Sequence, residues 1–339
     1  MAELGALVGV SAATVSRAIA GSPLVNAKTR EQILSLARAR GYVVNAAARS
    51  LRLKRTETIS VVIPLGHESS QPLTDPFFVE MLGHLAEEIT LRGYGMFLQK
   101  VLPPMADWLP RLIAAGRADG VIVIGQSTEH ATLTEAAKTY RPLVVWGADV
   151  PGHGYCTVGS DNTAGGVAAV THLVQTGRTR ILFLGDPAIP EIGQRYDGYC
   201  RALEAAGLAA QHEVPAHLTA DAAYRTVHDL TRGDARFDAI FAASDVIAIS
   251  AIRALTAAGR SVPQDVAVVG FDDIAMAAHT NPPLSTVRQD LTRGAKALVD
   301  LVFRRIAGEN TPSIVTPTEL IVRESSAAAG RTSRKRARG

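Results

Sequence analysis

The chain of 339 residues is 47% hydrophobic but only 5% aromatic, and its formal net charge is +3. It is long enough for two or three domains, and its aliphatic composition favours helices packed on parallel sheet over an all-β fold. No apolar run approaches the ~20 residues that span a bilayer, the N-terminus lacks the basic and apolar regions of a secretory signal and the two cysteines lack metal-ligand spacing, so we expect a cytoplasmic protein with no membrane partner, metal or cofactor.

The charge is unevenly distributed along the chain. Residues 1–55 carry nine Lys or Arg and two acidic residues, whereas residues 331–339 carry five basic residues and no acidic one. The segment between them has 21 basic and 30 acidic residues, a net charge of −9. A basic head on an acidic body suggests that the head meets a polyanion. The basic tail at 331–339 is predicted to be disordered, without a specific partner.

The N-terminal sequence predicts two short helices joined by a turn. Gly9 permits the turn, and Ser11 is a suitable N-cap for the second helix. Two such helices form a helix-turn-helix, whose second helix enters the major groove of DNA. Helical spacing places Leu4, Leu7, Val8, Val15, Ala18 and Ile19 on the inner faces and Ala12, Ala13, Ser16 and Arg17 on the outer face.

Several side chains of this unit are suited to DNA. Arg17 can donate two hydrogen bonds to one guanine edge. Ser11, Thr14 and Ser16 carry short hydroxyl groups, which suit contacts with phosphate. These residues make the helix-turn-helix a candidate reading head.

A third helix is expected to follow and to complete a small core. Asn26 is a plausible N-cap, and Gly41 is expected to end the helix. Ile33, Leu36 and Ala37 form its predicted inner face. Three helices in about 45 residues make a module that is marginal alone.

From residue 58 onward, strand-like runs alternate with helical patterns, which predicts an α/β fold. This order implies parallel sheets covered by helices, and its repetition suggests two lobes with a cleft between them. The predicted strands are 58–64, 95–101, 120–125, 142–147, 180–185, 239–244 and 266–271, and the predicted helices are 76–92, 106–115, 163–176, 194–206, 222–232 and 246–258.

The carboxyl ends of these strands are where ligands bind on such sheets. Gln126, Trp146 and Ser244 lie at or just after predicted strands. Asp245 and Asp272 also follow strands, and their carboxyl groups could accept hydrogen bonds from sugar hydroxyls. For Asp245 the alternative role is that of a helix N-cap, and both roles can coexist.

Three stretches of the head carry a more specific pattern: GVSAATVSRAIAG at 9–21, VNAKTREQILSLARARGY at 25–42 and NAAARSL at 45–51. They resemble the DNA-binding head of the lactose-repressor (LacI/GalR) family of bacterial regulators. The resemblance implies that Ala12, Ala13 and Arg17 read bases and that Ser11, Thr14, Ser16, Asn26 and Thr29 contact phosphate.

The resemblance also implies a hinge helix at 46–52, which forms on operator DNA. Leu51 matches the leucine that wedges into the minor groove and kinks the duplex, and its alternative role is that of a helix-core leucine. Ala48 would let two hinge helices approach, and Asn45, at the start of the segment, is with Ala48 and Leu51 a further candidate DNA contact. With little apolar surface beyond Leu51, residues 45–55 are expected to order only against DNA and a twin.

The body resembles the effector domain of the same family, which is similar to a periplasmic sugar-binding protein. The matching stretches are DPFF at 75–78, GSDNTAGG at 159–166, QRYDGYCRAL at 194–203, SDVIAISAIRAL at 244–255, VVGFDD at 268–273 and PPLSTVRQD at 282–290. The resemblance implies that Arg195 grips an effector and that Asp272 lies opposite it. With the strand-end residues, the candidate effector site is Asp75, Phe77, Phe78, Gln126, Trp146, Arg195, Ser244, Asp245 and Asp272.

Two departures from the family pattern bear on this site. Ser244 stands where the family usually has asparagine, and Gly147-Ala148 stands where it often has Asp-Arg. Trp146 is therefore a candidate stacking face in place of a usual ligand contact. A sugar is the expected effector, and a nucleobase is the alternative.

The sequence thus predicts four segments: a helix-turn-helix domain at 1–44, a hinge helix and linker at 45–57, a two-lobed effector-binding and dimerisation body at 58–330, and the tail at 331–339. The predicted function is that of a transcriptional regulator, and a repressor in the first instance, that binds palindromic operator DNA as a homodimer. The effector is expected to lower operator affinity, and a corepressor that raises it is the alternative.

Two other functions are disfavoured. An enzyme is disfavoured because the chain has no P-loop, no G-x-S-x-G elbow, no H-E-x-x-H and no dinucleotide-binding glycine motif. A periplasmic sugar-binding protein fits the body, but the basic head and the absence of a signal sequence argue against it.

Overall fold

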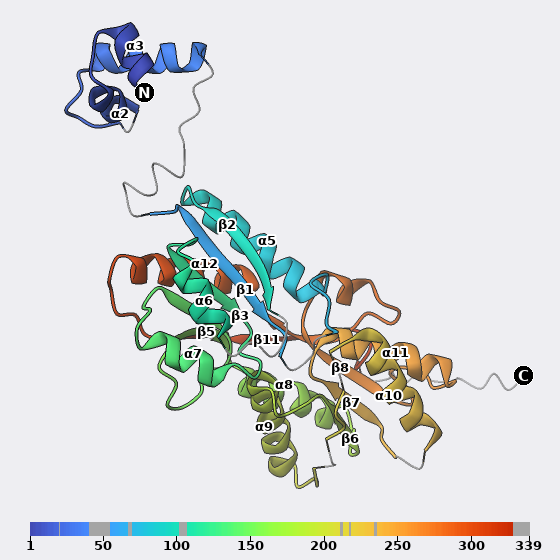
Figure 1. Cartoon of the computed structure of the whole chain (residues 1–339). Helices are drawn as coiled ribbons and strands as arrows, with labels where there is room; N and C mark the ends of the chain where they lie inside the picture. The colour runs from blue at the N-terminus through green and yellow to red at the C-terminus, as the bar shows by residue number, and fades with distance from the viewer. Residues whose placement is uncertain are drawn as a thin grey trace, which may run out of the picture. The chain divides into compact units, whose positions relative to one another are not determined.

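The computed structural model describes residues 1–19, 21–40, 55–66, 70–101, 107–210, 213–216, 218–233 and 236–327. The chain divides into two compact units, Met1–Thr56 and Glu57–Gly339 (Figure 1). The predicted hinge residues Asn45, Ala48 and Leu51, the helix end at Gly41 and the tail at 331–339 lie outside the described residues.

The head contains the three predicted helices. They are α1 (Ala2–Val8), α2 (Ala12–Ile19) and α3 (Ala27–Ala39). Ser11 caps α2, because its Oγ accepts a hydrogen bond from the Thr14 N–H at 3.1 Å. Asn26 caps α3 in the same way, through Oδ1 and the Thr29 N–H at 2.8 Å. Both predicted N-caps are therefore confirmed.

The small core of the head differs from the predicted one at Leu7, which is 51% exposed. Gly5 is buried instead, and a Cβ there would lie 2.5 Å from the Val10 carbonyl oxygen. The buried arc of α1 therefore runs over Leu4, Gly5 and Val8, which leaves Leu7 outside it. The other core residues are Val15, Ala18, Val25, Ile33 and Ala37, with Val8, Val10, Ile19 and Leu36 packed against them.

The first lobe of the body, which we call the N-lobe, is built on a six-stranded sheet in the order β10-β5-β4-β3-β1-β2. Every neighbouring pair in this sheet is parallel. The strands are β1 (Thr58–Pro64), β2 (Gly95–Val101), β3 (Gly120–Ile124), β4 (Leu143–Trp146), β5 (Cys156–Ser160) and β10 (Ile314–Thr316), and the helices are α5 (Pro76–Leu91), α6 (Trp108–Ala114), α7 (His130–Ala137) and α12 (Leu291–Ile306).

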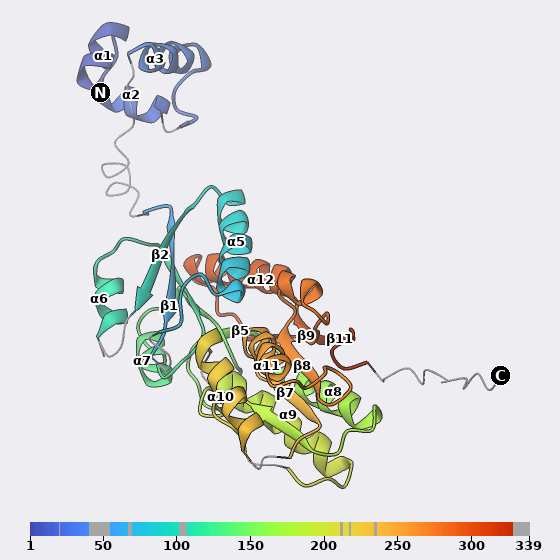
Figure 2. The same cartoon turned by 90° about the vertical axis from the view of Figure 1, so that its right-hand side faces the viewer.

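The inner strands β1, β3, β4 and β5 of the N-lobe sheet are buried on both faces, as their continuous apolar sequences predict, whereas the edge strand β2 is exposed or half-buried. Successive residues of β1 enter different cores: Val61 packs with Met81 of α5 and Leu298 of α12, whereas Val62 packs with Trp108 of α6 and Leu133 of α7. Figure 2 shows α5 and α12 on one side of β1 and α6 and α7 on the other. This alternation is the period of two expected for a strand.

The second lobe, which we call the C-lobe, has a five-stranded sheet in the order β11-β9-β8-β7-β6. Among its described strands, only β11 is antiparallel to its neighbour, β9. The helix pairs α8–α9 and α10–α11 flank this sheet (Figure 2). The elements are β6 (Ile181–Leu184), β7 (Ala239–Ala242), β8 (Ala267–Asp272), β9 (Ser285–Gln289), β11 (Thr318–Ile321), α8 (Asn162–Gln175), α9 (Pro190–Ala205), α10 (Ala220–Arg232), α11 (Asp245–Ala257) and the 3₁₀ helix η1 (Ala275–His279).

The two predicted lobes are confirmed, but the chain passes between them more often than the sequence rhythm indicates. It crosses after β5, returns after β9 so that α12 covers the N-lobe sheet, and crosses again between β10 and β11. The elements of the body that the sequence pattern did not predict are α7, β5, η1, β9, α12, β10 and β11.

Within the described part of the chain, no single helix is long and apolar enough to cross a membrane. Only α1 and α2 taken together, bent by 96° at their junction, pass that test of length and composition.

Candidate functional site

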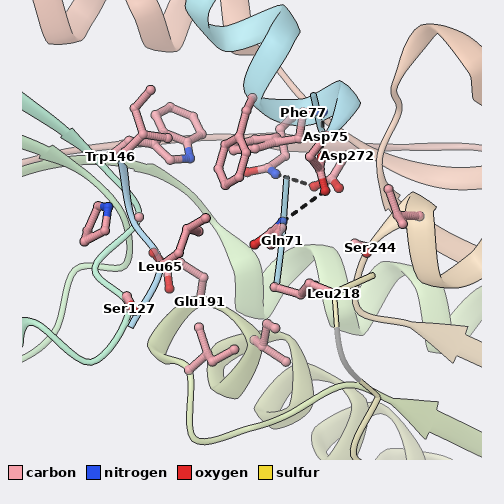
Figure 3. Close-up of a pocket in the computed structure, with 18 of the residues that line it drawn as sticks. Leu65, Gln71, Asp75, Phe77, Ser127, Trp146, Glu191, Leu218, Ser244 and Asp272 are labelled. Atoms are coloured by element: carbon pink, nitrogen blue, oxygen red, sulfur yellow. Dashed lines mark hydrogen bonds between the residues drawn. The ribbon is translucent and has the colours of Figure 1, made fainter. Parts of the chain in front are cut away.

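A pocket lies between the two lobes of the body (Figure 3). The space between its lining residues is about 710 Å³, a figure that includes open solvent at the mouth. It is lined by the carboxyl ends of strands from both sheets, namely Pro64 of β1, Ile124 of β3, Trp146 of β4, Asp272 of β8 and Gln289 of β9. The strand-end rule therefore located the pocket correctly.

Most of the predicted effector residues meet in this pocket. Two of them, Gln126 and Asp245, do not line it. The pocket also includes polar residues that the sequence pattern did not indicate: Gln71, Glu191 and Gln289. The predicted residues that line the pocket are Asp75, Phe77, Phe78, Trp146, Arg195, Ser244 and Asp272.

Arg195 is held rigidly in the wall of the pocket. Its Nε donates to Oδ1 of Asn162 at 2.9 Å, and its Nη1 donates to the carbonyl oxygen of Ala243. The guanidinium carbon lies 3.8 Å from the ring centre of Phe271, a cation–π arrangement. These contacts orient the planar group through Nε, Nη1 and its face, and Nη2 makes no hydrogen bond to the Asn162 side chain or the Ala243 carbonyl, so it is available to a ligand.

Asp272 lies beside this arginine, with Oδ1 3.9 Å from Arg195 Nη1. Burial raises the pKa of Asp272 to about 7, although Arg195 and a 2.7 Å hydrogen bond from Gln289 Nε2 both favour the charged form. The nearby Asp75 adds to the increase. The φ angle of Asp272 is +124°, a backbone conformation that non-glycine residues rarely adopt and that concentrates at functional sites.

Asp75 joins the wall of the pocket to the start of α5. Its Oδ1 accepts from the Phe77 N–H at 3.0 Å, so it caps the helix, and its Oδ2 accepts from Gln71 Nε2 at 3.0 Å. Burial raises the pKa of Asp75, whereas both hydrogen bonds oppose the increase. Gln71 lies in the connection between β1 and α5, where no periodic pattern in the sequence marks it as a pocket residue.

Glu191 links the pocket wall of the C-lobe to the N-lobe. It lies in the first turn of α9, and its Oε1 accepts from the backbone N–H of Gln126 at 3.2 Å. Burial raises the pKa of its carboxyl group, and the positive charge of Arg195 opposes that increase. The sequence pattern predicted a helix beginning at 194, although Pro190 followed by an acidic residue is a recognisable start signal.

Gln126 is a structural residue of the N-lobe rather than a pocket residue. Its Nε2 donates to the Ala148 carbonyl at 2.7 Å and to Tyr155 Oη at 2.9 Å, and its Oε1 accepts from the Ala148 N–H at 3.0 Å. A Cβ at Gly147 would lie 2.7 Å from Gln126 Cγ. The Gly147-Ala148 departure therefore makes room for this buried amide. Gln126 lies outside the pocket lining, and its contact with an effector stays a prediction.

Asp245 is also engaged within the fold. It is fully buried, accepts from Thr286 Oγ1 and accepts from the Ile274 N–H at 3.0 Å. The N-cap of α11 is Ser244, whose Oγ accepts from the Ile247 N–H at 3.3 Å. Both carboxylate oxygens of Asp245 therefore serve the loop and strand beside α11, and its contact with an effector stays a prediction.

The aromatic side chains of the pocket belong partly to the N-lobe core. Phe77 and Phe78 form an edge-to-face pair with ring centres 5.7 Å apart. Trp146 is only 4% exposed, and a Cβ at Gly294 of α12 would lie 2.3 Å from its ring. The indole is thus pressed against α12, so it offers an edge of the pocket rather than a wide stacking face.

The outer face of α2 differs from the predicted one at a single position. Ala12, Ala13 and Arg17 are exposed, as expected for residues that read DNA. Ser16 is only 8% exposed and lies among the buried residues of α2, so its predicted place on the outer face is wrong. It follows Val15 at the edge of the buried arc, where the packing of α2 covers it.

Two of the side chains predicted to contact phosphate already lie close to each other. The Ser11 and Thr14 hydroxyl groups are 2.9 Å apart, within hydrogen-bond distance. Asn26 is exposed and Thr29 is half-buried. Within the described ranges, no group of three or more His, Cys, Asp and Glu residues could hold a metal ion.

Each of the two units matches a known protein family. Residues 1–45 match the family of bacterial regulatory proteins called the lacI family, and residues 170–326 match the periplasmic binding protein-like domain. The transcriptional regulator CelR of Thermobifida fusca is 34% identical over 336 residues, covering 95% of this chain and 96% of its own length.

Solved structures extend this similarity to the fold. A complex of the transcriptional regulator CelR with cellobiose has a TM-score of 0.72 and 32% identity, covering 96% of this chain and 98% of its own. The lac repressor dimer bound to operator and the anti-inducer ONPF has a TM-score of 0.83, covering 95% of this chain and 97% of its own, and at 23% identity it shows a shared fold.

Proposed function

Since the chain belongs to the lacI family of bacterial regulatory proteins, and is therefore a helix-turn-helix transcriptional regulator, we propose that a small molecule in the pocket between its lobes controls its affinity for operator DNA. One observation carries this proposal: a single chain joins a head with an exposed α2 face to a body whose pocket holds the oriented Arg195 beside Asp272. We propose that operator binding represses transcription and that the protein acts in the cytoplasm. No reaction is assigned to the pocket.

The proposed operator is palindromic and the proposed regulator is a homodimer, because one helix-turn-helix reads only a few base pairs. Exposed apolar side chains support a partner surface. The edge strand β2 exposes Phe97 and Leu98 by 38% and 36%, and the neighbouring α5 exposes Val79 and Leu91 by 53% and 80%. An apolar edge strand beside an apolar helix face favours association with another protein surface.

The proposed effector is a sugar. The pocket offers a guanidinium donor, carboxylate acceptors and the edges of Phe77 and Trp146, and this combination suits hydroxyl groups and the apolar faces of a pyranose. A cellobiose complex of the similar regulator CelR supports the same class. A nucleobase is the alternative ligand, and the experiment includes one.

Hydrogen bonds between the lobes provide the proposed coupling. Glu80 of α5 accepts from the Ala275 N–H at 2.8 Å, and Gln194 of α9 donates to the Asp149 carbonyl at 3.2 Å. A ligand bound between the lobes changes the relative stability of their arrangements, which is the differential binding that allostery requires. Because β1 begins just after residues 55–57, movement of the N-lobe is transmitted along the chain toward the hinge segment.

The proposal is tested by selecting palindromic operators from a random library and measuring binding of the full chain by fluorescence anisotropy. Cellobiose, maltose, ribose and adenine are first compared by thermal shift, and any stabilising compound is added to the operator titration. We expect a sugar to stabilise the protein and to weaken operator binding. A compound that strengthens operator binding would identify a corepressor, and stabilisation without any change in operator affinity would contradict the proposed coupling.

A further inference from the structure

The pocket lining carries more acidic than basic side chains. Three carboxyl groups line it, from Asp75, Glu191 and Asp272, whereas Arg195 is the one cationic side chain among the described residues of its lining. That guanidinium already serves Asn162 and the Ala243 carbonyl. A ligand that fits this pattern brings donors, since buried acceptors without partners cost free energy.

One acceptor in this set has no partner within the described part of the chain. Gln71 is only 6% exposed, and its Oε1 makes no hydrogen bond to any described residue. The amide is held in this orientation because an ionised Asp75 only accepts, so the Gln71 nitrogen must face it. In Figure 3 the nitrogen faces Asp75 and the oxygen turns away from it, among the other pocket side chains.

The backbone around Gln71 is also fixed. Its carbonyl oxygen accepts from Lys100 Nζ at 3.1 Å, and the lysine itself does not line the pocket. The loop is therefore anchored to β2 at the residue whose side chain enters the pocket. A buried amide oxygen that is oriented and left without a partner is a site prepared for a donor that the protein does not supply.

We infer that the pocket selects an uncharged polyhydroxylated ligand, with Gln71 Oε1 accepting a ligand hydroxyl and Glu191 opposing any acidic group. This inference rests on the proposed function, because it specifies the effector of the same site. An anionic ligand would have to lie among three carboxyl groups and compete with protein acceptors for one guanidinium, whose Nε and Nη1 already donate within the fold. A neutral sugar instead brings hydroxyl donors, one of which Gln71 Oε1 can accept.

The inference is tested on the full chain at pH 8 by isothermal titration calorimetry with matched pairs of probes. The pairs are cellobiose and cellobionate, maltose and maltobionate, and ribose and ribose 5-phosphate. We expect at least one neutral sugar to bind and its acidic counterpart to bind at least about tenfold more weakly. This comparison uses the unaltered protein, so it does not depend on the folding of any variant.

Two variants assign the effect to residues. Gln71→Leu keeps the volume but removes the acceptor, and it should weaken the neutral sugar about tenfold, because a ligand hydroxyl loses its partner. Glu191→Gln should reduce the ratio between neutral and acidic affinities about tenfold. Gln99→Leu is the matched control: it lies on β2 away from the pocket, where it accepts from Ser60 Oγ, and it should change neither quantity.

The possible results of these titrations distinguish a failure of the inference from a failure of the proposed sugar effector. If an acidic probe binds as tightly as its neutral counterpart, selection against anions is wrong while a sugar effector stands. If Gln71→Leu binds the neutral sugar as the unaltered protein does, the role of Gln71 is wrong. If no member of any pair binds, the proposed sugar effector fails, and the inference fails with it.

Discussion

Glu191 of the C-lobe accepts a hydrogen bond from the backbone N–H of Gln126 of the N-lobe, 3.2 Å away, so the two lobes are joined at the edge of the ligand pocket. The same carboxyl group lines the pocket. A ligand that approaches Glu191 therefore contacts a group that holds the lobes together. We therefore expect occupancy of the pocket to influence the arrangement of the lobes.

Arg195→Met should remove the response to effector. The variant keeps an apolar stem but loses the guanidinium, both its donors and its stacking on Phe271, and we expect the thermal shift caused by an active sugar to disappear. Arg201→Met on the same helix is the matched control, because Arg201 is exposed and does not line the pocket. An undiminished shift in the Arg195 variant would contradict its assignment.

The stability of the unliganded protein should fall as the pH rises from about 4 to about 7. Asp272 has an ordinary pKa of 3.8 in the unfolded chain and a pKa of about 7 in the folded protein. The folded state therefore holds a proton that the unfolded state has released, and stability declines until both states are ionised. The raised pKa values of Asp75, Glu191 and Asp245 act in the same direction. Urea unfolding at several pH values measures this slope, and Asp272→Asn should make it shallower.

Affinity for a neutral sugar should increase with rising pH, whereas the stability of the unliganded protein decreases. An ionised Asp272 accepts hydroxyl donors more strongly than a protonated one, so affinity is expected to increase as the pH rises through about 7. Calorimetric titrations at pH 6 and pH 8 test this. Equal affinities at the two values would indicate that the ligand does not contact this carboxyl group.

Arg17 and Ser16 should behave differently in operator binding although they are adjacent. Arg17 is exposed on α2, and Arg17→Ala should weaken specific binding by about 1–3 kcal/mol if it reads a guanine. Ser16 is buried, so Ser16→Ala should have a smaller effect on affinity for the selected operator. Equal losses from both substitutions would place Ser16 at the DNA after all.

Substitutions at two helical glycines should change the free energy of unfolding in opposite directions. The first, at Gly198, concerns the packing of the helix that carries Arg195. Gly198 lies where α9 crosses α8, and a Cβ there would be 2.3 Å from the Thr163 carbonyl oxygen. Gly198→Ala should destabilise the protein by about 1–3 kcal/mol. Gly83 is exposed within α5 and has open space around it, so Gly83→Ala should stabilise by about 0.5–1 kcal/mol. Denaturant unfolding distinguishes the two signs.

The sequence predicted the parts of the fold that depend on local pattern. The caps at Ser11 and Asn26 and the buried strand at 58–64 follow from residue type and spacing, and all were confirmed. The crossing of α12 back to the N-lobe was missed, because only tertiary packing against β3, β4 and α5 decides which sheet that helix covers.

The sequence predicted those pocket residues whose position follows from the direction of a strand. It did not predict the positions that depend on the hydrogen-bond partners of individual side chains. Asp272 at the end of β8 lines the pocket as the strand-end rule requires. Gln126 follows the same rule, but its amide turns to the Ala148 backbone. Gln71 reaches the pocket from a loop whose path no periodicity specifies, so only the folded structure reveals it.

The most direct test of control of the head by the pocket is the dissociation constant of the active sugar, measured by calorimetry with and without saturating operator DNA. Coupling between two sites is reciprocal. If the sugar is an inducer, operator should weaken sugar binding by the same factor by which sugar weakens operator binding, typically about 5- to 150-fold. An unchanged dissociation constant would show that the pocket and the head act independently, and it would contradict the proposed allosteric regulation.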